Sequence, residues 1–376
     1  MTTHSQTTAT VRQPGQRLPT LTGLRGVACL MVLLCHLGVS LAPRVTSQTL
    51  PMMVFGVLGV TAVSFFFVLS GFVLTWVARP DDTPGKFWRA RAVKIFPGHL
   101  VVLAAAVLLM LAAGIPVALE HIVPSLLLVQ AWFPVIDVVF NSAANDPSWS
   151  LACEVFFYAL FPGLLVLVRR IPGNRLWMCA CAIVAVMAFL PFAARALPDQ
   201  PLLDGLPWWE HWLLIFAPPV RALEFVLGMV TAEIVVRGRW RGPSQRWAWL
   251  IVLLGMALTA PIVGVYKGQV LLAVSAVTLI AAAAADDAAG RSGRLARPFA
   301  VQLGTLSLAL FLVHWPVIAY GPIGMADPAS SVEALGIGEA LLMASTSTVL
   351  SFVAAWLLYR FVETPAVLRW GRRSRR

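Results

Sequence analysis

Charged residues are scarce in this sequence of 376 residues. Only 12% are Asp, Glu, Lys or Arg, and just 17 of these are acidic, whereas soluble proteins carry about 25%. Hydrophobic residues make up 59%, and the mean hydropathy is +0.82. This is more apolar side chain than the interior of a water-soluble globule can bury. The composition therefore excludes a chain of soluble domains and a disordered chain, and it predicts a protein solvated mainly by lipid.

Cysteine is also rare, and internal repeats are absent. The five cysteines all lie inside apolar segments: Cys29, Cys35, Cys153, Cys179 and Cys181. Their positions exclude a secreted disulfide scaffold, and their spacing resembles no zinc site. We therefore expect small buried hydrophobic side chains and no bound metal.

The sequence contains ten apolar stretches. Each is close in length to a membrane-spanning helix, which needs about 20 residues. They cover 22–41, 54–78, 96–114, 149–168, 176–194, 213–236, 246–265, 267–285, 300–320 and 338–360. Continuous apolar runs of this length favour helices over the alternating strands of a barrel. The segment 122–133 is too short to span, so we expect it to be re-entrant or interfacial. The predicted fold is an all-α polytopic membrane protein with about ten transmembrane helices.

The basic residues predict the orientation of these helices. The net charge of +11 comes from short clusters between apolar stretches, which is the pattern of a topology signal and not of a nucleic-acid-binding surface. With both termini in the cytoplasm, 23 of the 28 Lys and Arg residues lie inside and only Arg44, Arg195 and Lys267 lie outside. The first span is interpreted as a helix and not as a cleaved signal peptide, because Arg25 and His36 interrupt it.

The chain is expected to form one membrane domain, residues 21–365, in the plasma membrane. A disordered cytoplasmic tail, 1–20, precedes it, and a basic cytoplasmic tail, 366–376, follows it.

Ionisable residues inside the predicted spans are functional candidates, because a charge in a bilayer costs several kcal/mol. They are Arg25, His36, Glu154, Arg221, Glu224, Glu233 and His314. Arg25 and His36 lie about 20° apart on one helix face and about 16 Å apart along its axis. Counting along the spans places His36, Glu154 and His314 at a similar depth in the outer half, which predicts a polar cluster. Arg221 and Glu224, three residues apart, are expected to neutralise each other.

A cytoplasmic loop ends in the cations Arg89, Arg91 and Lys94. Two interpretations remain for this cluster. It either only orients the helix and contacts anionic lipid, or it binds phosphate, for which arginine is well suited.

Five motifs follow one another along nearly the whole chain. They are Leu24-Arg25-Gly26 with His36, Phe66 to Phe72, Trp149-Ser150-Leu151 with Glu154 and Tyr158, Leu308 to Pro316 with His314, and Phe361 to Pro365. In this order and spacing they resemble the acyltransferase 3 family of integral membrane acyltransferases. The chain departs from the family pattern at Lys94, where an arginine is expected, and at His99, where a tyrosine is expected.

The resemblance implies an enzyme that moves an acyl group, often acetyl, from cytoplasmic acyl-coenzyme A to a hydroxyl of a sugar or another acceptor. The residues implied to bind this co-substrate are Arg25, Ser70, Arg89, Arg91 and Lys94. His36 is implied as the general base, a role that suits an imidazole, and Glu154 as the group that orients it. Tyr158, Ser150 or a backbone amide is expected to stabilise the oxyanion. Trp149, Ser150 and His314 are the candidate acceptor-binding residues.

Several alternatives stay open. Direct transfer is favoured over an acyl-enzyme on Ser70 or Cys35. A proton-coupled transporter or flippase of a lipid-linked or small polar substrate is the main competing function, with His36, Glu154 and His314 relaying protons. A structural assembly partner is a third. The acceptor is a carbohydrate, such as a surface polysaccharide, or a secondary metabolite. The tryptophans of the outer loops form either an acceptor platform or an interfacial belt; they are Trp132, Trp208, Trp209 and Trp212.

Overall fold

The computed structural model describes residues 17–45, 49–140, 144–203, 205–261, 268–324 and 335–371. Its long helices are α1 (Pro19–Val45), α2 (Thr49–Val77), α3 (Pro84–Ala112), α6 (Trp149–Arg170), α7 (Leu176–Ala194), α9 (Pro218–Val236), α10 (Gln245–Thr259), α11 (Gln269–Ala288), α12 (Pro298–Tyr320) and α13 (Ile337–Leu358). Within the described residues, 9 helices are long and apolar enough to cross a membrane. An all-α polytopic architecture is therefore confirmed.

The remaining predicted span, 246–265, corresponds to α10. This helix has only 15 residues, which is shorter than a full crossing, and residues 262–267 lie outside the described part of the chain. Of the predicted tails, 1–16 and 372–376 also lie outside it. Helix α1 already begins at Pro19, so residues 19–20 are helical and do not belong to a disordered tail.

Three predicted boundaries need correction. Helix α3 begins at Pro84 and not at 96, because its first turns carry cations that a search for apolar runs excludes. The predicted span 213–236 is broken into α8 (Trp208–Ile215) and α9, where Pro218 and Pro219 begin a new helix. Beyond α13, π-helical turns at Tyr359–Glu363 and Val367–Gly371 flank α14 (Thr364–Ala366), so helical structure continues past the expected domain end at 365.

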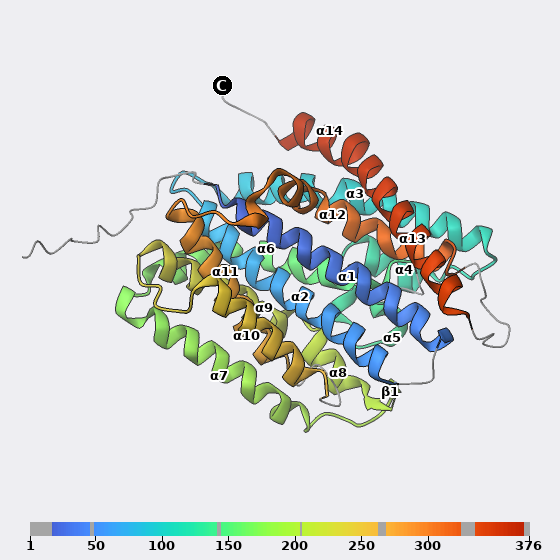
Figure 1. Cartoon of the computed structure of the whole chain (residues 1–376), viewed down its shortest axis with the longest axis horizontal. Coiled ribbons are helices and arrows are strands. Elements are labelled where there is room, and N and C mark those ends of the chain that lie inside the picture. The colour runs from blue at the N-terminus through green and yellow to red at the C-terminus, as the bar shows by residue number, and fades with distance from the viewer. Residues whose placement is uncertain are drawn as a thin grey trace, which may run out of the picture.

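Figure 1 shows α1 and α2 in the middle of the bundle, α7 along one edge, and α13 with α14 along the opposite edge. Burial agrees with this arrangement. In α2, 61% of the residues in its most apolar 18-residue stretch are buried inside the protein. The corresponding fractions are 17% for the span that contains α7 and 22% for the span that contains α13. The two edge helices therefore present most of their apolar surface outward, as lipid-facing helices do.

The segment between α3 and α6 packs one of its sides against the bundle. Its described elements are α4 (Leu119–Leu126), η1 (Gln130–Trp132), α5 (Ile136–Val139) and η3 (Asp146–Ser148). Gln130 and Ser148 are completely buried, and the amide of Gln130 donates to Ser148 Oγ at 3.0 Å. Leu126, Leu127 and Phe133 are exposed. That 122–133 is re-entrant or interfacial therefore stays a prediction.

Two of the outer tryptophans hold this segment in place. Trp208 is completely buried, and its Nε1 donates to the Pro134 carbonyl at 2.8 Å. Trp212 Nε1 donates to the Ala131 carbonyl at 3.1 Å. Trp208 follows a two-stranded hairpin of β1 (Leu202–Leu203) and β2 (Leu206–Pro207), paired antiparallel with Leu203 opposite Leu206. Trp208 therefore belongs neither to an open platform nor to an interfacial belt.

The cysteines and the predicted ion pair of α9 can also be compared with the structure. All five cysteines are free, but only Cys29, Cys35 and Cys153 are buried, whereas Cys181 is exposed on α7. Arg221 and Glu224 form an ion pair of 2.9 Å in which both side chains are buried. Ser64 of α2 also donates to Glu224 at 2.9 Å. The expectation that Arg221 and Glu224 neutralise each other is confirmed.

Glycines let two pairs of helices approach closely. In α12, a Cβ at Gly304 would overlap the Thr22 carbonyl of α1, and Gly26 faces the same contact from the α1 side. Between α2 and α9, a Cβ at Gly71 or Gly228 would likewise overlap the partner backbone. Helices in lipid pack most tightly where such small residues meet. The contact of Gly26 and Gly304 fixes α1 against α12, the helices that carry His36 and His314.

Gly304→Ala is expected to separate α1 from α12 and to destabilise the protein by about 1–3 kcal/mol, the usual cost of overpacking. The measurement is thermal unfolding of the detergent-purified protein. Gly163→Ala is the matched control, because Gly163 also lies in a helix but a Cβ there meets no atom within 4 Å. Equal melting temperatures for the two variants would contradict the close-contact interpretation.

Candidate active site

Three cavities adjoin one another at one end of the bundle. We call this the inner end; it is where α3 carries Arg91 and Lys94, and the sequence predicts that it faces the cytoplasm. The Arg91 cavity, about 140 Å³, lies among α1, α2, α3, α6 and α12. The Phe311 cavity, about 70 Å³, lies deeper. The Arg17 cavity, about 480 Å³, lies at the inner ends of α1, α2 and α12.

Arg25 connects these cavities, because its side chain lines all three. Its Nη2 donates to Ser307 Oγ of α12 at 3.1 Å. A guanidinium has five N–H donors, so this single bond leaves donors for a ligand. Arg25 therefore places a positive charge where the cavities meet.

The Arg91 cavity gathers most of the residues predicted to bind the co-substrate. Its lining includes Arg25, Ser70, Arg91 and Lys94, together with Glu154 and Tyr158. Arg91 lies with its guanidinium carbon 5.8 Å from the centre of the Phe87 ring, and its Nε is buried without a hydrogen-bond partner. Among the described residues no carboxylate forms an ion pair with Arg91 or Arg25. Both arginines thus face this cavity without a direct ion pair, and Glu154 is the carboxylate that shares its lining with them.

The other two predicted phosphate ligands are already occupied. Lys94 forms an ion pair with Glu363 of the closing Glu-x-Pro motif, whose side chain is only 1% exposed. Arg89 is exposed, and its Nη2 donates to the Trp370 carbonyl at 2.8 Å. Lys94 therefore balances a buried carboxylate, and Arg89 lies outside the Arg91 cavity.

Ser70, Tyr158 and Glu154 form a hydrogen-bonded row along the cavity wall. Tyr158 Oη donates to Glu154 Oε2 at 2.8 Å, and Ser70 Oγ lies 3.3 Å from Tyr158 Oη. Because the tyrosine proton is directed at the carboxylate, Ser70 is the donor in the second bond. The row joins α2 to α6 at the depth of Arg25.

His36 and His314 contact each other directly. His314 Nε2 lies 3.0 Å from His36 Nδ1, and the ring centres are 5.0 Å apart. His314 Nδ1 lies 2.7 Å from the Phe311 carbonyl and 3.2 Å from the Leu310 carbonyl. The structure therefore brings together two of the three titratable groups that the sequence placed at one depth.

The carbonyl contacts determine the tautomers of the pair. Carbonyl oxygens only accept hydrogen bonds, so Nδ1 of His314 carries its proton. In a neutral His314 the other nitrogen, Nε2, then accepts a proton from His36 Nδ1. His36 consequently carries its lone pair on Nε2, as a general base requires. The arrangement resembles a triad in its logic, with His314 as the orienting group.

Glu154 lies elsewhere than expected. It was predicted at the depth of His36, but it lines the cavities around Arg25, and its hydrogen bond is to Tyr158. The reason is that α6 begins inside the bundle. Just before it, Asn145 is buried and donates to the Leu312 carbonyl in α12 at 3.1 Å. Counting from a helix end at the membrane surface therefore places Glu154 too far outward.

The two remaining predicted acceptor ligands differ in position. Ser150 lines the Phe311 cavity, and its Oγ donates to the Pro147 carbonyl at 3.1 Å. Trp149 packs edge-on against Phe216, with ring centres 4.7 Å apart, and near Phe67 at 6.4 Å. Trp149 thus lies in an aromatic cluster and lines none of the three cavities.

Sequence reasoning missed Phe311. It lines the Phe311 cavity, and its ring centre lies 5.8 Å from that of His314. Its position three residues before His314 was the available signal, because a residue at i−3 shares the face of its helix. An apolar residue in an apolar span gives no other sign of its role.

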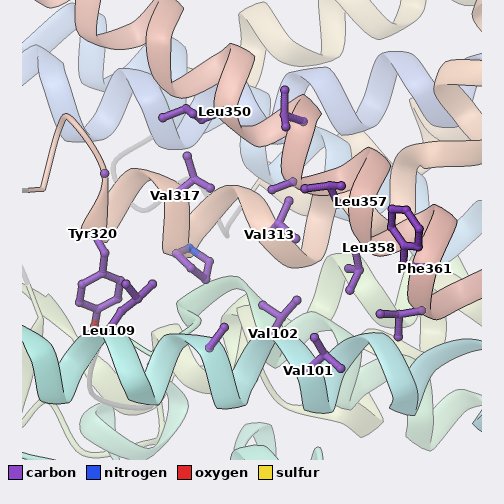
Figure 2. Close-up of a pocket in the computed structure, with 16 residues that line it drawn as sticks. Val101, Val102, Leu109, Val313, Val317, Tyr320, Leu350, Leu357, Leu358 and Phe361 are labelled. Atoms are coloured by element: carbon purple, nitrogen blue, oxygen red, sulfur yellow. The ribbon is translucent and has the colours of Figure 1, made fainter.

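A cavity larger than these three is separate from this site. It has a volume of about 620 Å³ and lies between α3, α12 and α13. Figure 2 shows that its walls are aliphatic, with Val101 and Val102 facing Val313 and Val317, and Tyr320 at one end. A choice of active site by volume alone would favour this cavity. It is not our candidate active site, because Tyr320 is its one titratable lining residue and its lining contains no cation.

Removing Lys94 is expected to destabilise the protein, because it leaves the Glu363 carboxylate buried without a cation. Lys94→Ala should cost about 3 kcal/mol, the low end of the range for breaking a buried pair, since Lys94 is 33% exposed. The double variant Lys94→Met with Glu363→Leu should recover most of this loss. The measurement is thermal unfolding of the purified protein. A double variant as unstable as Lys94→Ala would contradict the pairing.

Comparison with known proteins identifies the family of the chain. A family model described as an acyltransferase domain matches residues 18–360. The chain is 38% identical over 363 residues to the acyltransferase MdmB of Streptomyces mycarofaciens, covering 95% of this chain and 93% of the relative. It is 28% identical to the exopolysaccharide production protein ExoZ of Rhizobium meliloti, over 85% and 92% of the two chains. No solved structure matches it.

A further relative is the peptidoglycan O-acetyltransferase OatA of Listeria monocytogenes, which is 23% identical over 95% of this chain and only 57% of its own length. The family match, the order of the motifs and the apolar helices point the same way. The chain belongs to the acyltransferase 3 family of membrane proteins, and it is an enzyme that transfers acyl groups.

Proposed function

We propose that this enzyme transfers an acyl group from acyl-coenzyme A to a hydroxyl of a carbohydrate or glycosylated acceptor, and that the acyl group is acetyl. The thioester approaches from the cytoplasmic side of the plasma membrane, and His36 is the general base. One observation carries the proposal. The contact with His314 leaves His36 with its lone pair on Nε2, and on the same helix Arg25 faces cavities at the inner end.

The charges of the Arg91 cavity support an anionic donor. Coenzyme A carries several phosphate charges, and arginine binds phosphate with paired N–H groups. Arg25 and Arg91 line the cavity and form no ion pair with a carboxylate of the described residues. Lys94 contributes less than the sequence suggested, because Glu363 balances its charge.

The distance between Arg25 and His36 along α1 fits a long, narrow donor arm. Arg25 and His36 are separated by about 16 Å along the helix. A thioester whose nucleotide stays at the inner end extends its acyl group toward His36 by this length. The Phe311 cavity lies on that route, since it shares Arg25, Glu154, Phe66 and Leu308 with the Arg91 cavity.

The chemical step is a direct transfer. The acceptor hydroxyl gives its proton to His36 Nε2 while its oxygen attacks the thioester carbonyl carbon. The new carbon–oxygen bond forms a tetrahedral oxyanion, which then expels the coenzyme A thiolate as the carbon–sulfur bond breaks. The imidazolium returns the proton to the thiolate. His314 stabilises the imidazolium by accepting from Nδ1–H throughout.

The row of Ser70, Tyr158 and Glu154 is assigned to the donor side. Its depth matches that of Arg25, so it lies before the reacting carbonyl along the route. Glu154 offsets part of the positive charge of Arg25 and Arg91, and Ser70 offers a hydroxyl to the amide groups of the donor arm. We therefore assign general base catalysis to His36 and donor positioning to Glu154 and Tyr158.

The names of two relatives support a carbohydrate acceptor. One is a peptidoglycan O-acetyltransferase and another an exopolysaccharide production protein. Hydroxyl groups of sugars are poor nucleophiles at neutral pH, which is why a positioned base is needed. His36 lies in the outer half of α1, so the acceptor reaches it from the outer side.

His36→Ala is expected to lower acyl transfer about 10²–10⁴-fold, the usual contribution of a general base. The measurement is transfer of labelled acetyl from acetyl-coenzyme A to the carbohydrate fraction of membranes that contain the protein. His121→Ala in α4 is the matched control, since it lies outside all three cavities and should retain activity. Transport of a lipid-linked sugar that survives His36→Ala without thioester consumption would instead establish the flippase alternative.

His314 variants test the tautomer. His314→Ala should lower kcat about 10²–10⁴-fold with the KM for acetyl-coenzyme A unchanged, because His36 loses the acceptor for its Nδ1 proton. His314→Gln should recover part of this activity, because the amide oxygen of glutamine accepts the same bond. Equal losses in the two variants, or a change confined to KM, would show that His314 does not orient His36.

A further inference from the structure

The Phe311 cavity has the composition of a small acyl pocket. Its apolar wall comes from α2, α6 and α12, and its polar groups lie on α1, α6 and α12. The apolar residues are Val63, Phe66, Phe67, Leu151, Leu308 and Phe311. The polar residues are Arg25, Ser150, Glu154 and Ser307. A pocket with mostly apolar walls and a few polar groups is typical of sites that hold a small organic group.

The position of this cavity follows the expected path of the donor. It shares Arg25, Phe66, Glu154 and Leu308 with the Arg91 cavity. Phe311, which lines it, lies with its ring centre 5.8 Å from that of His314. Phe311 is therefore the lining residue with a ring contact to the histidine pair.

We propose that the Phe311 cavity receives the acyl group of the donor and that the Phe311 ring limits acyl length. This inference rests on the proposed function, because it takes an acyl thioester as the donor. The ligand class is a short, unbranched acyl group of two or three carbons.

The size of the cavity supports a short acyl chain. Its volume is about 70 Å³, half that of the Arg91 cavity at about 140 Å³. Both Phe66 and Phe67 of α2 contribute rings to its wall, and Phe67 is 1% exposed and packs edge-on against Phe157 at 5.0 Å. A wall packed in this way yields little to a longer chain. One methylene in such a pocket changes a rate about 10–200-fold.

Phe311 is the lining residue whose truncation enlarges the cavity on the side of the histidine pair. Its ring centre lies 5.8 Å from that of His314. The backbone carbonyl of Phe311 accepts from His314 Nδ1 at 2.7 Å, and a side-chain truncation leaves this bond in place. Phe311→Ala therefore changes acyl length selection without removing the orienting contact.

The experiment compares acetyl-, propionyl-, butyryl- and hexanoyl-coenzyme A as donors for the full-length protein in lipid nanodiscs. The readout is release of free coenzyme A thiol in the presence of membrane carbohydrate as acceptor. For wild type, the rate should fall at least about 10-fold from propionyl to butyryl. For Phe311→Ala, the ratio of butyryl to acetyl rates should rise at least about 10-fold. Phe189→Ala is the matched control, because Phe189 is 66% exposed on α7 and lines none of the cavities.

A second variant covers the case in which Phe311→Ala does not fold. Val63 lines the Phe311 cavity but not the Arg91 cavity, so Val63→Phe narrows only the proposed acyl pocket. We expect it to lower propionyl transfer at least about 10-fold more than acetyl transfer. Competitive inhibition by free coenzyme A, which has no acyl group, should stay unchanged.

The outcomes separate this inference from the proposed function. A wild type that consumes none of the four thioesters would overturn the acyl-coenzyme A donor. A wild type that transfers acetyl, with both pocket variants keeping the wild-type order of donors, would overturn the acyl pocket alone. Inhibition by free coenzyme A that is lost in Val63→Phe would also overturn it, because the narrowing would then act on the rest of the donor.

Discussion

The cost of an uncompensated charge in an apolar interior organises this protein. Most of its intramembrane ionisable groups have a partner: Arg221 forms an ion pair with Glu224, and Lys94 with Glu363. Such pairing removes most of the penalty of burial. Arg25 and Arg91 are different: among the described residues no carboxylate forms an ion pair with either, and Glu154, which lines the same cavity, is hydrogen-bonded to Tyr158. The cavity therefore has an excess of positive charge, and this excess is the basis for proposing an anionic ligand there.

The close packing of α1 against α12 converts this charge pattern into a site. Gly26 and Gly304 allow the two helices to touch along their backbones, and the same contact aligns Arg25 with Ser307 and His36 with His314. Both polar contacts occur in the same order along the two helices, so the helices run parallel. A parallel pair held by backbone contact keeps its register, and register determines which nitrogen of His36 faces His314.

The sequence predicted the helices better than it predicted contacts between distant segments. Apolar runs located the spans. The motifs assigned Arg25 and Ser70 to the donor but Glu154 and Tyr158 to the chemistry at His36, whereas all four line the Arg91 cavity. The partner of Lys94 was not predictable, because Glu363 is 269 positions away. The depth of Glu154 was misjudged, because α6 begins inside the bundle and no apolar run records a buried, irregular segment before a helix.

The separation of the two polar clusters constrains any mechanism for this chain. The Ser70–Tyr158–Glu154 row lies at the depth of Arg25, whereas the histidine pair lies three helical turns further along α1. An acyl-enzyme on Ser70 would leave its acyl group far from His36, and a proton relay would need further titratable groups between the two clusters. A donor that is itself long and flexible needs neither. The geometry therefore favours a thioester that spans the distance with its own arm over a covalent or proton-relay intermediate.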